Sequence, residues 1–245
     1  MPRFFVTQDR ISNGTVTIVG DDAFHISRSL RMAAGEHITV CDQSGVEYDC
    51  VLVGFGNEVT AEVVSRSASL TEPPFSATLW QALPKGDKLD TVIQKSVECG
   101  IHSIALFESE HCIVRYDRAS DAKKAERRSR IAAEAAKQSG RGIIPSVSSP
   151  VSFDEMLERA AKADLALFCY EGDSTVPLGK LLDTPLPQNP TVSVVVGPEG
   201  GFSPDEAEKA RKAGMLMVGL GPRILRTETV APFVLGALVC KFELS

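Results

Sequence analysis

A chain of 245 residues is long enough for one large domain or two smaller ones, each with a real hydrophobic core. The composition is that of an ordinary globular protein, with 43% hydrophobic and 24% charged residues. No apolar run approaches the roughly 18 residues that a membrane span requires, and the N-terminus lacks the apolar stretch of a signal peptide. We therefore expect a cytoplasmic protein that makes no membrane contact.

Six cysteines are scattered along the chain, without a CxxC pair and without a histidine at metal-ligand spacing. Several of them lie in apolar runs, such as Cys169 at the end of the run 165–169. Reduced cysteines in a protein core are the favoured interpretation. We expect neither a disulfide framework nor a bound metal.

The formal net charge of −6 argues mildly against a nucleic-acid partner. Charge distribution matters more than the sum, however. Between Arg115 and Arg141, nine lysines and arginines stand against four acidic residues. A solvated helix face and a nucleic-acid surface both fit this segment.

The first 68 residues read as short strands separated by Gly, Asn and Asp turns. The segments rich in β-branched residues are 15–19, 37–41, 46–53 and 58–64. One short helix is predicted over 22–32. Many short strands with polar turns favour a small β-barrel, and 67–74, with its two prolines, is a plausible linker.

From Ala77 onward, strands and helices alternate. A strand over 77–83 leads into a helix whose apolar residues recur at helical spacing until Gly100. A long helix over 121–139 has Ser120 as a possible N-cap and Gly140 just beyond its end. The remaining elements are strands at 101–107, 164–169, 192–196 and 215–219, and helices at 153–162, at 204–213 and from about 228. This alternation predicts a mostly parallel α/β sheet.

A glycine-rich turn follows the strand at 192–196. That strand is a continuous apolar run, as expected for a strand buried on both faces, and a capping box at 203–206 opens the next helix. The turn 197–201 (Gly-Pro-Glu-Gly-Gly) therefore lies at the carboxyl end of a central strand, where open α/β sheets bind ligands. It matches neither phosphate-binding glycine motif, and Glu199 disfavours an anion. A neutral or cationic ligand held by backbone groups fits better, with a purely structural turn as the alternative.

A second turn, 220–229, follows the strand at 215–219 and precedes an apolar helix. Pro232 can be accommodated only if that helix begins close before it. Arg226 and Glu228 are therefore predicted to lie at a strand-to-helix junction beside the first turn. We interpret the two turns together as one ligand site.

These two turns resemble the paired C-terminal motifs of the SPOUT (trefoil-knot) methyltransferases, and more narrowly those of the RsmE family, which methylates N3 of a uridine in small-subunit (16S) rRNA. Further segments resemble the same family at 25–32, 81–88, 93–96 and 134–141. The likeness spans nearly the whole chain. Two departures stand out: His111 replaces a usual arginine, and Val230 replaces a usual alanine.

The resemblance implies an α/β protein with a PUA-like RNA-binding β-barrel over 1–70. A SPOUT methyltransferase domain would follow over 75–245, with a parallel sheet and a C-terminal trefoil knot. The protein would act as a homodimer on 16S rRNA or the small ribosomal subunit. The implied cofactor is S-adenosyl-L-methionine, and its expected binding residues are Gly197, Pro198, Glu199, Gly200, Gly201, Leu220, Gly221, Ile224, Leu225, Thr227 and Thr229.

N3 of uracil is a weakly acidic imide, so it must lose a proton before or during attack on a methyl group. Our hypothesis is that Arg226 stabilises the developing anion and that Glu228 accepts or relays the proton. In the structural alternative, Glu228 caps the last helix or pairs with Arg226. The candidate RNA contacts are Arg3, Arg28, Arg31, Lys85, Lys88, Gln138 and Arg141.

Three other functions remain open at this point. Another SPOUT reaction, 2′-O-ribose methylation, would share the cofactor turns but would need an activated hydroxyl. A non-catalytic rRNA-binding assembly factor would not need the intact glycines of both turns. A phosphate-binding NTPase is disfavoured by Glu199.

Overall fold

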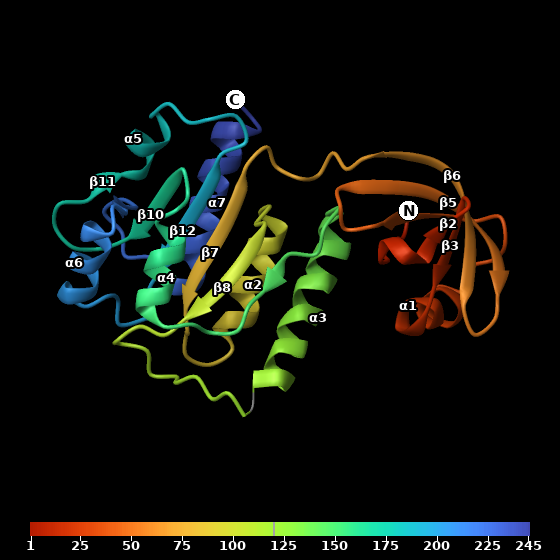
Figure 1. Cartoon of the computed structure of the whole chain (residues 1–245), viewed down its shortest axis with the longest axis horizontal. Helices are drawn as coiled ribbons and strands as arrows, with labels where there is room; N and C mark the ends of the chain where they lie inside the picture. Colours follow the sequence, from red (N-terminus) through yellow and green to blue (C-terminus); the bar gives the residue numbers. More distant parts are fainter. Residues whose placement is uncertain (120) are drawn as a thin grey trace. The chain divides into compact units, whose positions relative to one another are not determined.

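The structure is a computed structural model that describes residues 1–119 and 121–245. Ser120, the predicted N-cap, lies outside the described residues. Figure 1 shows the chain, which forms two compact units: Met1–Glu72 with Ala136–Ile144, and Pro73–Ala135 with Pro145–Ser245. Residues 136–144 thus belong to the first compact unit. The functional domains expected over 1–70 and 75–245 stay a prediction.

The first unit is built on a mixed six-stranded sheet with strand order β1-β4-β5-β6-β3-β2. The strands are β1 (Arg3–Phe5), β2 (Ile11–Ser12), β3 (Thr15–Ile18), β4 (His37–Cys41), β5 (Val46–Phe55) and β6 (Val59–Ala68). Only β1 and β4 run parallel; the other neighbouring strands are antiparallel. The predicted small barrel is thus a mixed sheet with β1 and β2 as its edges.

Alternating burial along the strands explains this sheet. Val16 and Ile18 of β3 are buried, as are Ile38 and Val40 of β4, while the residues between them are less buried. The helix predicted over 22–32 is α1 (Gly20–Phe24), followed by a π-helical turn, η2 (His25–Ser29). Ala23 of α1 and Ile26 of η2 are buried in the same core.

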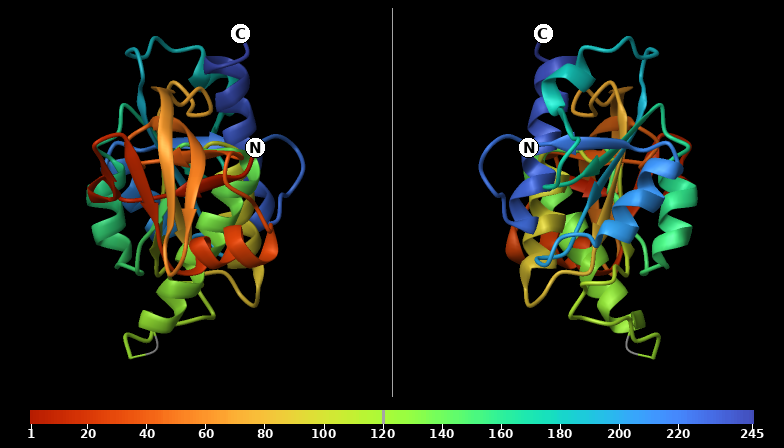
Figure 2. Two further views of the ribbon diagram at one scale, coloured as in Figure 1. Left: turned by 90° about the vertical axis from the view of Figure 1, so that its right-hand side faces the viewer. Right: turned by 90° about the vertical axis from the view of Figure 1, so that its left-hand side faces the viewer.

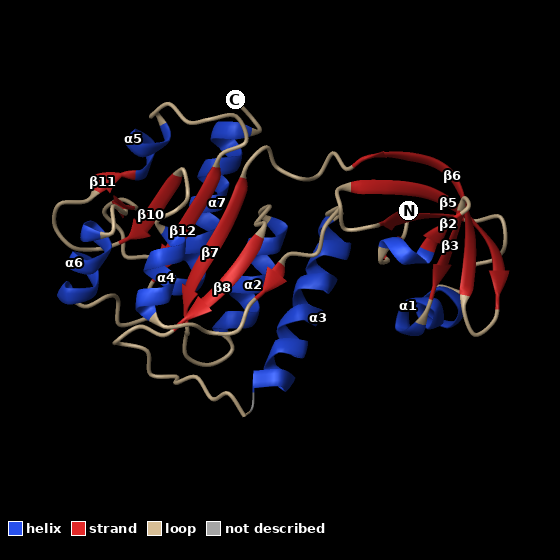
Figure 3. Ribbon diagram, viewed as in Figure 1, coloured by secondary structure: helices blue, strands red, loops and turns tan. Residues whose placement is uncertain are grey.

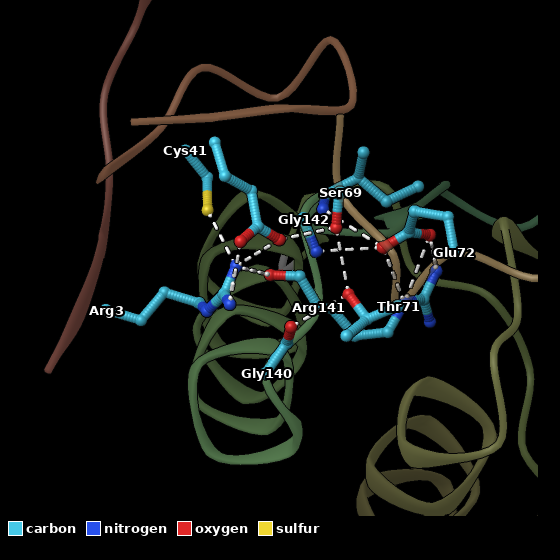
Figure 4. Close-up of polar contacts among 10 residues, drawn as sticks. Arg3, Cys41, Ser69, Thr71, Glu72, Gly140, Arg141 and Gly142 are labelled. Carbon is cyan, nitrogen blue, oxygen red and sulfur yellow. Dashed lines mark hydrogen bonds and ion pairs between the residues drawn. The ribbon is translucent and has the colours of Figure 1, made fainter. Parts of the chain in front are cut away.

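A polar network joins residues 69–72 to residues 140–142 within this unit (Figure 4). Arg141 donates to both carboxylate oxygens of Glu72, at 2.9 Å from Nε and 2.6 Å from Nη2. The backbone N–H of Gly142 donates to the same carboxylate at 2.8 Å. Arg3 of β1 likewise donates to Glu47 of β5 at 2.7 Å. Two carboxylates therefore each hold an arginine in the first unit.

The second unit contains a seven-stranded sheet with strand order β11-β13-β10-β12-β7-β8-β9. The strands are β7 (Ser76–Ala82), β8 (Ser103–Phe107), β9 (Ser146–Val147), β10 (Leu165–Cys169), β11 (Val176–Pro177), β12 (Thr191–Val196) and β13 (Leu216–Gly219). Every neighbouring pair is parallel. The central strand β12 is buried from its second residue to its last, as its apolar run predicted.

Helices cover both faces of this sheet. They are α2 (Lys88–Glu98), α4 (Phe153–Ala160), α5 (Leu178–Leu182), α6 (Pro204–Lys212) and α7 (Thr227–Phe242). Figures 2 and 3 show α4 and α6 on one face and α2 and α7 on the other. A further long helix, α3, spans Asp121–Ser139, the range that the sequence predicted. The predicted mostly parallel α/β sheet is confirmed.

Several predicted boundaries are also confirmed. Gly100 and Gly140 follow α2 and α3 with φ of +89° and +74°, in the left-handed region that glycine adopts without strain. The capping box of α6 forms between Ser203 and Glu206.

Among the described residues, no helix is long and apolar enough to cross a membrane. The trefoil knot stays a prediction.

Candidate functional site

The two glycine turns line one cavity. They follow β12 and β13, and both strands are parallel neighbours of β10, so their carboxyl ends share one edge of the sheet. The cavity measures about 660 Å³, within the ~300–1,000 Å³ of small-molecule sites. Its walls are 196–202, 219–227, several residues of 169–175, Lys88 and Val230.

Close packing and backbone conformation explain the glycines of the first turn. A Cβ on Gly200 would lie 3.1 Å from Cβ of His111, so a larger residue would push that segment away. Gly201 has a φ of +67° and donates its N–H to the carbonyl oxygen of Pro198 at 3.0 Å. Close contact at Gly200 and the positive φ at Gly201 therefore each favour glycine in the turn that lines the cavity.

A buried hydrogen-bond chain connects the first turn to the beginning of α7. Thr227 Oγ1 donates to the carbonyl oxygen of Gly197 at 2.8 Å. The same hydroxyl accepts from Nε2 of Gln81, a fully buried residue of β7, at 3.0 Å. This chain fixes the relative position of the two turns.

Glu199 and Lys88 form an ion pair beside the cavity. Glu199 Oε1 accepts from Lys88 Nζ at 2.8 Å and from the backbone N–H of Lys85 at 3.0 Å. Burial alone would raise the pKa of Glu199, but the hydrogen bond from Lys88 and those from backbone N–H groups hold that pKa below its ordinary value. Glu199 is therefore an anion neutralised by Lys88.

Lys88 also reaches the second turn. Its Nζ lies 3.8 Å from Glu228 Oε2, in the first turn of α7. That Glu228 oxygen is buried, and within the described residues it accepts no hydrogen bond. Lys88, rather than Arg226, is therefore the cation that lies beside Glu228 in this structure.

Arg226 is exposed at the wall of the cavity and precedes the first residue of α7. Over 1–119 and 121–245, its guanidinium group forms no hydrogen bond and no ion pair. A cationic group held at a cavity wall without a protein partner is available to a ligand. The structure thus brings Arg226 and the carboxylate of Glu228 to the same helix start.

His111 lies against the first turn. A carbonyl oxygen can only accept, so His111 Nδ1 donates to Gly200 O, at 3.0 Å. The buried carboxylate of Glu206 holds this segment by accepting from Ser109 Oγ at 3.1 Å and from the backbone N–H of Glu110 at 2.9 Å. The departure at His111 therefore places a histidine in contact with the turn that lines the cavity.

All the expected cofactor residues line the cavity except Thr229. Thr227 turns inward to Gly197, and residues two apart on a helix point about 200° apart, so Thr229 faces solvent instead. Sequence reasoning missed Tyr170, Glu171 and Gly172, which also line the cavity. They directly follow β10. Since ligands bind at the carboxyl ends of strands in open α/β sheets, this position could have indicated them.

Two expected RNA contacts, Arg141 and Arg3, are paired with carboxylates. The side chain of Arg141 is only 3% exposed and is paired with Glu72, while that of Arg3 is 16% exposed and is paired with Glu47. Both guanidinium groups are bound to carboxylates of their own unit. They hold the first unit together and offer little surface to a phosphate.

The other expected RNA contacts divide between the units. Arg28, Arg31 and Gln138 are exposed in the first unit, and Lys85 is exposed in the second. Lys88 is half-buried and belongs to the cavity through Glu199. Across the described residues, no group of three or more His, Cys, Asp or Glu could hold a metal ion.

Comparisons with known families agree over both units. Residues 71–239 match the model of an RNA methyltransferase domain, and residues 18–64 match that of an RNA methyltransferase PUA domain. The first match covers more than half of the chain and includes both glycine turns.

Individual relatives match over most of their length. The chain is 35% identical to ribosomal RNA small subunit methyltransferase E of Bacillus subtilis, covering 100% of this chain and 98% of the relative. It is 32% identical to the Mycobacterium bovis protein of the same name, covering 92% and 86%. A crystal structure of that enzyme from Neisseria gonorrhoeae, bound to S-adenosyl methionine, has a TM-score of 0.85, 33% identity and coverage of 98% and 97%.

Proposed function

The chain belongs to the ribosomal RNA small subunit methyltransferase E family of RNA methyltransferases, and from this premise we propose that it transfers the methyl group of S-adenosyl-L-methionine to N3 of a specific uridine in 16S rRNA. The observation that carries the proposal is the single cavity shared by both glycine turns, with Arg226 at its wall. A small-subunit rRNA substrate implies work in the cytoplasm.

The cavity fits the proposed cofactor. Residues 197–201 and 220–225 line it. In the first of these turns, the ion pair between Glu199 and Lys88 leaves little net charge. A relative of this chain was crystallised with S-adenosyl methionine bound. The cofactor would supply a methyl group already activated as a sulfonium, so positioning of the acceptor would contribute most of the acceleration.

Arg226 and Glu228 would act on the acceptor base. The guanidinium group of Arg226 would bind the uracil oxygens and stabilise negative charge as N3 loses its proton. The Glu228 carboxylate would accept or relay that proton, and its buried Oε2 accepts no hydrogen bond within the described residues. Lys88 Nζ lies 3.8 Å from that oxygen.

We also propose that the protein works as a homodimer. Thr229, Phe233, Gly236 and Cys240 form one exposed, uncharged face of α7. Since a helix that is apolar all round is normally buried, a second copy is the proposed cover. Dimerisation is also what the family resemblance implies.

The experiment that tests the catalytic assignment compares Arg226→Ala and Glu228→Gln with wild type, using saturating cofactor and rRNA. We expect the Arg226 variant to lose about a hundredfold or more in turnover, as for the removal of one anion-stabilising donor. Loss of the base is expected to cost about a hundredfold as well.

Lys212→Ala is the control, because Lys212 is an exposed cation of the same unit, on α6, and does not line the cavity. Its turnover should stay within a few-fold of wild type. Near-wild-type turnover of both test variants would show that Arg226 and Glu228 are structural.

A further inference from the structure

An exposed phenylalanine lies beside two arginines on the surface of the first unit. Phe24, the last residue of α1, is 64% exposed, the largest value for any phenylalanine in the described residues. Val19 and Leu30 are also exposed, at 37% and 41%. An aromatic ring held in water forgoes the free energy of burial. Three exposed apolar side chains within one short segment indicate a contact surface.

The backbone fixes the direction of Phe24. Ala23 and Ile26 on either side of it are buried in the core of the first unit, so the Phe24 ring faces outward. The helix then widens into the π-helical turn η2, in which the N–H of Leu30 donates to His25 O at 2.9 Å. Such π-turns are rare and are frequently found at functional sites. Arg28 lies four residues beyond Phe24, on the same side of the helix.

The surface around Phe24 is positively charged. Arg28 and Arg31 are exposed, and neither forms an ion pair or side-chain hydrogen bond within the described part of the chain. Arg31 has a φ of +52°, a conformation that non-glycine residues seldom adopt. Of the nearby carboxylates, Asp22 is paired with Lys137 at 2.6 Å and Glu36 accepts from the backbone N–H of Ala33 at 2.7 Å, while Asp21 is exposed.

We propose that this surface binds an unpaired segment of RNA, with one base stacked on the Phe24 ring and phosphates bound by Arg28 and Arg31. Aromatic rings with adjacent cations bind single-stranded nucleic acids in this manner. In a duplex the base faces are already stacked, so a protruding ring finds no partner there. The inference rests on the proposed function, since it names the form of RNA that the first unit recognises.

The test measures binding of full-length protein to a fluorescent, unstructured RNA oligonucleotide by anisotropy, over a series of salt concentrations. Phe24→Ala should weaken binding about tenfold at each salt concentration, the loss expected for one stacked base, with an unchanged salt dependence. Arg28→Ala and Arg31→Ala should each reduce the slope of log affinity against log salt by about 0.7. A duplex of the same sequence should bind more weakly and be insensitive to Phe24→Ala.

Phe55→Ala is the matched control, because Phe55 is a 42% exposed phenylalanine at the end of β5. Phe24→Trp should retain binding, since tryptophan also stacks. Thermal melting should show that Phe24→Ala remains folded. Wild-type binding by Phe24→Ala, equal losses in Phe24→Ala and Phe55→Ala, or an unchanged salt slope in both arginine variants would overturn the proposal.

Assays of methyl transfer at saturating RNA keep this proposal separate from the proposed function. If wild type methylates rRNA and Phe24→Ala binds normally, the stacking surface is wrong and the proposed function stands. If Phe24→Ala loses binding and wild type transfers no methyl group, the surface stands and the proposed function is wrong.

Discussion

The hydroxyl of Thr227 donates a hydrogen bond to the carbonyl oxygen of Gly197 at 2.8 Å, and so connects two turns that are 30 positions apart in the sequence. Gln81 supports this bond from β7 by donating to the same hydroxyl. The two cavity walls are thus held by one buried side-chain contact. Disturbing it should affect ligand binding before it affects the fold.

Thr227→Val should weaken affinity for S-adenosylmethionine several-fold, because it removes a donor to Gly197 O and an acceptor of the Gln81 amide. Net hydrogen-bond contributions of about 0.5–1.5 kcal/mol set that magnitude. Thr227→Ser keeps the hydroxyl and should bind nearly as wild type. Isothermal titration calorimetry checks both; equal affinity of Thr227→Val and wild type would refute the role of this contact.

Glu199 should make stability depend on pH in the acid range. Its folded-state pKa is lowered, mainly by Lys88 against the opposing effect of burial. Its stabilising contribution is therefore complete above the ordinary glutamate pKa, about 4.3, and is lost as pH falls through the folded-state value. The difference in melting temperature between wild type and Glu199→Gln should be largest near neutral pH and vanish in acid. A difference that stays constant across this range would contradict the ion pair.

Arg141→Ala should destabilise the protein by about 3 kcal/mol, since it leaves Glu72 without its cation in a largely buried position. Arg141→Lys should recover only part of the loss, because lysine cannot form the two parallel hydrogen bonds. Urea denaturation provides the measurement, with the exposed Arg66 changed to Ala as control. Unchanged stability together with weaker RNA binding would contradict this structural role and support Arg141 as an RNA contact.

Phe233→Glu should convert the proposed dimer to a monomer, because it places a charge on the uncharged exposed face of α7. Size-exclusion chromatography with light scattering measures the mass directly. Phe55→Glu is the control, since the two phenylalanines are similarly exposed at 43% and 42%. A monomeric wild type, or a dimer in both variants, would rule out this face as the interface.

Local signals carried much of the fold. The capping box at Ser203 and Glu206, the glycine after α2 and the apolar run of β12 each depend on residues close in sequence. By contrast, β9 and β11 have two residues each, too few to show a periodicity. Alternation of long elements therefore predicted the sheet's centre, while its edges were found only in the structure.

The site was predictable only in part, for a related reason. The carboxyl ends of parallel strands indicated where the glycine turns meet. Nothing in the sequence pairs Lys88 with Glu199, which is 111 positions away, or Arg141 with Glu72, which is 69 positions away. Charged side chains carry no periodic signal of their partners. For that reason Arg3 and Arg141 seemed available to RNA although both pair with carboxylates.

The most direct test of the central claim is mass spectrometry of nucleosides from 16S rRNA incubated with the purified protein and methyl-labelled S-adenosylmethionine. The rRNA should come from cells that lack this activity. The account predicts a single labelled nucleoside, N3-methyluridine, formed by wild type and strongly reduced with Arg226→Ala. Label in a 2′-O-methylated nucleoside, or no label in any nucleoside, would contradict it.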